Sequence, residues 1–117
     1  FGAPESNHYA EAADFAKQAL AQVDSSGYAR AYSVFANASG VAADDLAGLQ
    51  VPSLFLTADG DPNSTPEMSQ AMDSIAPHGQ FQVITGHRHM VTLTAPEQVC
   101  ESLDTFFNSN DNPTDFQ

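Results

Sequence analysis

Basic residues are scarce in this 117-residue chain, which has only Lys17, Arg30 and Arg88 against fifteen Asp and Glu residues. The formal net charge of −12 repels the phosphates of nucleic acids and anionic lipids, so we expect neither as a partner. Such a surface would suit a salty habitat, where cations screen the self-repulsion. A well-solvated, soluble surface is the simpler interpretation.

Cysteine occurs once, at Cys100, which excludes an internal disulfide. The compartment therefore stays open, with the cytoplasm favoured. No apolar run approaches the roughly 20 residues that a membrane-spanning helix needs. The chain starts at Phe1 without a signal-peptide pattern, so we expect a processed chain, a fragment or a chain whose beginning is missing.

The composition is that of a globular protein, with 42% apolar residues, and the length is enough for one domain. The alanine-rich stretch from Tyr9 to Val23 predicts a helix. A second helix is predicted after Asp24–Gly27, with Tyr28 and Tyr32 on one face. Asp44 is expected to cap a short turn before the chain changes character.

Two short apolar segments, Val51–Thr57 and Phe81–Thr85, predict strands that are buried on both faces. Thr65 followed by Pro66 predicts the start of a helix between them. The capping-box pattern Thr94–Glu97 predicts the start of the last helix. The order of elements predicts an α/β fold with parallel strands and a right-handed crossover.

A parallel sheet is stable when several strands are present and both of its faces are covered. This chain offers only two predicted strands. We therefore expect it to dock against more sheet, from a missing segment, a second chain or a copy of itself.

Polar side chains follow both predicted strands. Asp59 and Asp61 come after the first strand, and His87 and His89 come after the second. Because the carboxyl ends of parallel strands share one edge of a sheet, a carboxylate and an imidazole can meet there and form a hydrogen bond. In hydrolases of this architecture the order is nucleophile, acid, histidine, so the nucleophile should come earlier. The chain has no G-x-S-x-G motif.

The segment Val51–Pro62 resembles the strand and acid loop of the α/β-hydrolase superfamily, and Thr65–Met68 continues the likeness. Gly86–Met90 together with Ala95–Val99 resembles the histidine loop and final helix of that family. The segments Gly27–Ala31 and Asp44–Leu46, which precede the first strand, are similar to those of enol-lactonase-like and lactonase-like members.

This resemblance implies the C-terminal part of an α/β-hydrolase fold, with parallel strands and flanking helices after a helical lid, incomplete as a lone chain. Residues 1–26 correspond to the lid, residues 27–108 to the core, and residues 109–117 to a flexible tail. The implied activity is ester or lactone hydrolysis without a cofactor. The nucleophile and oxyanion hole would come from an N-terminal part of the same hydrolase, on the same or a separate chain, so this chain alone should be inactive.

The resemblance also implies roles for single residues. Asp61 matches the acid and His89 the base, with Asp59 and His87 as the alternatives. The family usually has a small residue before the histidine, where this chain has Arg88.

Candidates for substrate contact are Tyr28, Tyr32 and Met90. The pair His87 and His89 is weak evidence for a metal, because no third ligand is defined, and we expect none. The alternative function is a non-catalytic binding or assembly module derived from the hydrolase fold.

Overall fold

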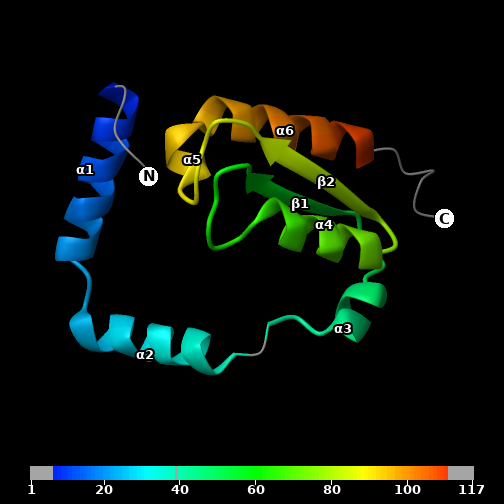
Figure 1. The fold of residues 1–117 in the computed structure, drawn as a ribbon, viewed down its shortest axis with the longest axis horizontal. Helices are drawn as coiled ribbons and strands as arrows, with labels where there is room; N and C mark the ends of the chain where they lie inside the picture. The colour runs from blue at the N-terminus through cyan, green and yellow to red at the C-terminus, as the bar shows by residue number, and fades with distance from the viewer. Residues whose placement is uncertain (1–6, 39, 111–117) are drawn as a thin grey trace.

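Two parallel strands form the centre of the structure, a computed structural model that describes residues 7–38 and 40–110 (Figure 1). β1 (Ser53–Ala58) pairs with β2 (Gly79–Ile84), and the register runs from Ser53 opposite Gly79 to Ala58 opposite Ile84. Both strands were predicted. Their parallel direction follows from the helix that connects them, which returns the chain to the same end of the sheet.

Helices cover the two sides of this pair. α4 (Pro66–Ile75) packs against both strands, and α6 (Pro96–Asn110) packs against β2 from the other side (Figure 1). The Thr65 hydroxyl accepts the Met68 N–H at 3.4 Å, as the sequence predicted for the start of α4. The small apolar core between sheet and helices consists of Leu56, Ile84, Val91, Ala95 and Val99.

A short helix, α5 (Val91–Thr94), lies between β2 and α6 and was not predicted. Thr94 is its last residue and is buried, with its hydroxyl 3.0 Å from Nδ1 of His87. The prediction that Thr94 caps the last helix is therefore wrong, because its hydroxyl oxygen contacts His87 in the loop after β2. Residues 109–110 belong to α6, so that part of the predicted tail is helical, and residues 111–117 lie outside the described residues.

The N-terminal segment forms an arm of three helices, α1 (Asn7–Ala21), α2 (Ser25–Asn37) and α3 (Ala43–Ala47). Asp24 caps α2 by accepting the Gly27 N–H at 2.9 Å. Asp44 lies in the first turn of α3 and does not cap it, contrary to the prediction; Ala42 occupies the cap position and offers no side-chain acceptor.

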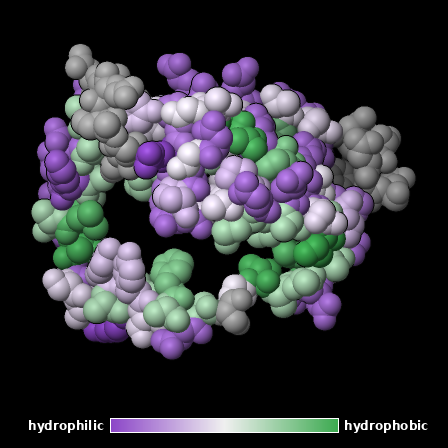
Figure 2. All heavy atoms as spheres, viewed as in Figure 1, coloured by the Kyte–Doolittle hydropathy of each residue, from purple (hydrophilic) through white to green (hydrophobic). Residues whose placement is uncertain are grey.

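The arm touches the rest of the molecule mainly at its ends, where α1 packs against α5 and α3 packs against α4 (Figure 1). Between these contacts α2 stands away from the sheet and buries no residue, and Figure 2 shows the same opening with side chains drawn. The large apolar side chains exposed along the arm are Phe15, Leu20, Val23, Tyr28, Tyr32, Val34, Phe35 and Val41. An apolar surface of this extent is typical of a binding interface.

The strands themselves are less buried than their sequences predicted. Only Thr57 and Ala58 of β1 and Ile84 of β2 are buried. The prediction of burial on both faces is wrong for this chain, because a two-stranded sheet leaves much of its surface uncovered. No helix within residues 7–38 and 40–110 has the length and hydropathy to cross a membrane.

Candidate active site

Both strands end in a loop at the same edge of the sheet. Residues 59–64 form the acid loop after β1, and residues 86–89 form the histidine loop after β2. Figure 1 shows both arrowheads pointing towards the end of the molecule where α5 and α1 lie. The parallel pairing thus brings together two loops that are far apart in the chain.

The acid loop and the histidine loop meet at Asp61 and His89. Nδ1 of His89 lies 2.9 Å from Oδ2 of Asp61, as the matched motifs predicted. The other carboxylate oxygen, Oδ1, accepts the backbone N–H groups of Asn63 at 2.8 Å and Ser64 at 2.9 Å. The Asp61 side chain is only 6% exposed, whereas that of His89 is 49% exposed. One oxygen therefore fixes the carboxylate to its own loop while the other orients the imidazole.

The electrostatics of Asp61 favour its charged form. Burial by itself would raise the pKa of Asp61, but the hydrogen bonds from the Ser64 N–H, the His89 ring and the Asn63 N–H outweigh burial and lower the pKa below its ordinary value. An ionised carboxylate can only accept, so Nδ1 of His89 carries the hydrogen. Nε2 of His89 then has a free lone pair, as a general base requires.

The alternative pair, Asp59 and His87, connects the loops at other points. Oδ1 of Asp59 accepts the Gly86 N–H at 2.8 Å, and the carbonyl of His87 accepts the Gly60 N–H at 3.0 Å. A Cβ on Gly60 would lie 2.8 Å from that carbonyl oxygen, so the loops approach this closely only because residue 60 is glycine. Asp59 and His87 therefore hold the two loops together and do not pair with each other.

The imidazole of His87 has two hydroxyl partners that the sequence did not reveal. Nδ1 of His87 lies 3.0 Å from the Tyr9 hydroxyl and 3.0 Å from the Thr94 hydroxyl. Tyr9 also donates to the Gly86 carbonyl at 3.2 Å, and its ring stacks on the imidazole with centroids 5.8 Å apart. Through Tyr9, α1 is attached to the histidine loop.

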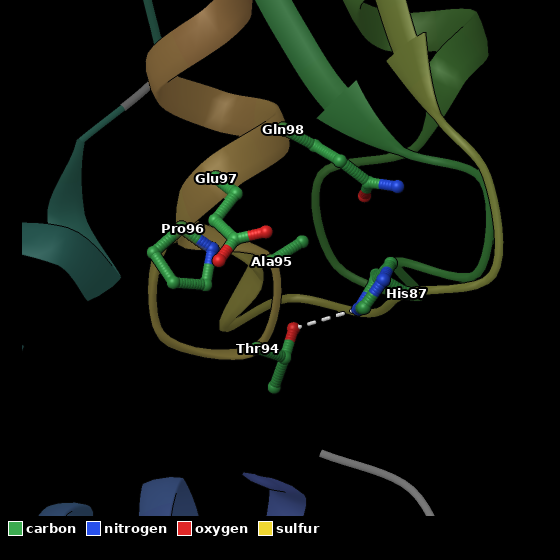
Figure 3. A pocket seen from close by; sticks show the side chains of 6 residues that line it. All are labelled: His87, Thr94, Ala95, Pro96, Glu97 and Gln98. Atoms are coloured by element: carbon green, nitrogen blue, oxygen red, sulfur yellow. Dashed lines mark hydrogen bonds between the residues drawn. The ribbon is translucent and has the colours of Figure 1, made fainter.

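A pocket of about 300 Å³ lies beside His87, at the start of α6 (Figure 3). Figure 3 shows the side chains around it, with the dashed hydrogen bond between Thr94 and His87 along one side. Neither Asp61 nor His89 lines this pocket, so it adjoins the candidate pair without containing it. Its lining residues are His87, Thr94, Ala95, Pro96, Glu97 and Gln98.

The three residues proposed for substrate contact lie in two different places. Tyr28 and Tyr32 are exposed on α2, with ring centroids 5.0 Å apart, so they contact each other. Met90 is half-buried and directly follows His89, at the cap position of α5. Their role in substrate contact stays a prediction.

His87 and His89 use their Nδ1 atoms for different partners, Tyr9 and Thr94 in one case and Asp61 in the other. Within the described part of the chain, no three His, Cys, Asp or Glu side chains are grouped closely enough to hold a metal ion. At this edge of the sheet a buried carboxylate orients a half-exposed imidazole.

Comparison with known proteins gave two informative matches, and no family model matches the chain. Over 90 residues the chain is 43% identical to the (E)-2-((N-methylformamido)methylene)succinate hydrolase of Acinetobacter baylyi, which covers 77% of this chain and 34% of that protein. It also resembles the solved structure of a thermophilic esterase from Thermogutta terrifontis with malate bound. The TM-score is 0.55 at 31% identity, over 57% of this chain and 25% of the esterase chain. The chain thus spans about a third of the length of the hydrolase that it matches.

Proposed function

Because this chain belongs to the α/β-hydrolase superfamily, we propose that Asp61 and His89 are the acid and the base of a triad that hydrolyses an ester or lactone. The observation that supports this most directly is the 2.9 Å hydrogen bond between Asp61 and His89 at the carboxyl ends of adjacent parallel strands. The nucleophile and the oxyanion hole are assigned to an N-terminal part of the same hydrolase, on the same or a separate chain. The fraction of the relative's length that this chain spans, 34%, leaves room for such a part.

The proton transfers of this proposal follow from the tautomer of His89. Nε2 accepts the proton of a serine hydroxyl as the serine oxygen attacks the acyl carbon, and the ionised Asp61 stabilises the imidazolium that forms. The imidazolium then gives this proton to the leaving alkoxide. In the second half, Nε2 takes a proton from water as the water oxygen attacks the acyl-enzyme, and returns it to the serine oxygen. With an aspartate nucleophile, His89 acts only in the water step.

The name of the matched hydrolase describes its substrate as a substituted succinate, which carries two carboxylates. We extend this feature to the present chain and assign it a small ester or lactone that bears a carboxylate.

An assembly module is the second candidate function. The exposed apolar side chains of α2, among them Tyr32 and Phe35, favour an assembly module, because such a surface usually binds another protein. The Asp61–His89 hydrogen bond favours the enzyme, since an assembly module has no chemical need for an oriented base.

The test uses the complete protein, with the nucleophile-bearing part included, and an activated ester. His89→Ala should abolish turnover, and Asp61→Asn should lower kcat by about 10⁴-fold, since an amide at position 61 favours the wrong imidazole tautomer. Asp104→Asn, an exposed change on α6, is the matched control and should leave the rate unchanged. Natively folded Asp61 and His89 variants that keep the unmodified rate would exclude these residues as acid and base. An unmodified complete protein without turnover would favour the assembly module.

A further inference from the structure

Arg88 lies between His87 and His89 in the histidine loop, and its side chain is exposed. Its Cγ lies next to the acid loop, because a Cβ built on Gly60 would meet it at 3.4 Å. The aliphatic stem of Arg88 therefore passes over the residue that separates Asp59 from Asp61. The guanidinium follows three bonds later, within reach of the rim where the two loops meet.

The nearby carboxylates do not need Arg88 as a partner. Asp59 already accepts the Gly86 N–H, and Asp61 already accepts two backbone N–H groups and the His89 ring. Within the described ranges 7–38 and 40–110, no carboxylate oxygen lies within 4.0 Å of a guanidinium nitrogen of Arg88, and the ion pair found is that of Asp61 with His89. Among the residues that the structure describes, a structural ion pair therefore does not explain a cation at this position.

The position of Arg88 affects how an anionic molecule is attracted to the candidate site. The net charge of −12 disfavours the approach of an anionic small molecule, and a cation beside the site offsets part of that repulsion. The other two cations lie on the arm, Lys17 on α1 and Arg30 on α2, where Arg30 donates to the Ser26 hydroxyl at 3.4 Å. Arg88 is the cation that belongs to the candidate site.

We infer that Arg88 is a specificity-determining residue, which binds a carboxylate of the substrate while the adjacent His89 serves the reaction. This inference rests on the proposed function. A guanidinium suits the role because its planar fork donates two parallel hydrogen bonds to one carboxylate. Because Arg88 directly precedes His89 in the chain, a carboxylate bound by its guanidinium would lie near the imidazole.

The experiment compares two activated esters of similar length in the complete enzyme, the neutral p-nitrophenyl butyrate and the anionic p-nitrophenyl hemisuccinate. Arg88→Gln should raise KM for the anionic ester by about 10- to 100-fold, as expected for the loss of hydrogen bonds to a charged group. Its kinetics with the neutral ester should stay those of the unmodified enzyme. Lys17→Gln and Arg30→Gln each remove one positive charge from the arm. Neither variant should change KM for either ester.

Each other result overturns a specific statement. Equal losses on both esters would make Arg88 a structural residue, and an unchanged preference for the anionic ester would exclude it from recognition while leaving the hydrolase intact. Equal shifts in the Lys17 and Arg30 variants would attribute the preference to net charge alone. An unmodified enzyme that hydrolyses neither ester would contradict the proposed function itself.

Discussion

The hydroxyl of Tyr9 lies 3.0 Å from Nδ1 of His87, although 78 positions separate the two residues in the chain. The same hydroxyl donates to the Gly86 carbonyl, so a single side chain of α1 contacts two consecutive residues of the histidine loop. The position of α1 and the conformation of this loop are consequently linked. A change in one should be measurable in the other.

Tyr9→Phe tests this link, because it removes only the hydroxyl and keeps the stacked ring. We expect faster backbone hydrogen exchange in both α1 and the histidine loop, from the loss of hydrogen bonding worth about 1 kcal/mol. Exchange followed by mass spectrometry measures both segments in one experiment. Tyr32→Phe, which removes an exposed hydroxyl on α2, should leave them unchanged. Unchanged exchange in Tyr9→Phe would mean that the contact does not restrain α1.

We expect Asp59 to stabilise the fold by accepting a hydrogen bond, and not by its negative charge. Asp59→Ala removes the acceptor of the Gly86 N–H and should lower the free energy of unfolding by about 1 kcal/mol. Asp59→Asn keeps an oxygen at that position and should restore most of the loss. Urea denaturation of the complete protein measures both values. A folded Asp59→Asn variant that is inactive while Asp61→Asn stays active would identify Asp59 as the acid.

Gly60 should not tolerate a methyl group. In Gly60→Ala the added Cβ would lie 2.8 Å from the His87 carbonyl oxygen, so the acid and histidine loops must separate. We expect a loss of about 1–3 kcal/mol in the free energy of unfolding, the usual cost of overpacking, together with lower activity. Gly48→Ala is the control, since its nearest backbone neighbour lies at 3.4 Å. Thermal unfolding of both variants distinguishes them, and equal stability would show that the loops are free to adjust.

The lowered pKa of Asp61 predicts a dependence of stability on pH in the acid range. The folded-state pKa lies below the unfolded value of about 3.9, so Asp61 contributes its full stabilisation above that value. The contribution should disappear as the pH falls from about 4 through the folded-state pKa. Unfolding by urea at a series of pH values, for the unmodified protein and for Asp61→Asn, isolates it. The two curves should converge towards low pH; a constant difference would exclude the ionisation of Asp61 as its cause.

The elements that the sequence predicted well are those with a local signal. The apolar runs placed both strands within two residues of their observed ends, and Thr65 with Pro66 marked the start of α4. The Asp61–His89 hydrogen bond was predictable because both motifs directly follow parallel neighbours. Local capping chemistry and strand order carry this information without any knowledge of the tertiary structure.

The features that escaped prediction depend on distant partners. Thr94 has the sequence pattern of a helix cap, but its hydroxyl forms a hydrogen bond with the imidazole of His87 and does not cap α6. In the sequence Tyr9 is an ordinary residue of a predicted helix, because the residues around it do not indicate a partner 78 positions away. The burial of a strand depends on how many neighbours it has, which its own sequence does not encode.

The β1–α4–β2 unit and the loop after it contain both members of the Asp61–His89 hydrogen bond. Asp61 and His89 are 28 positions apart, and the acceptor on Asp59 and the close approach at Gly60 lie within the same stretch. The strand register that sets Ala58 opposite Ile84 therefore also sets the acid loop beside the histidine loop. Parallel strand pairing thus converts a separation of 28 positions in the chain into a contact of 2.9 Å between two side chains.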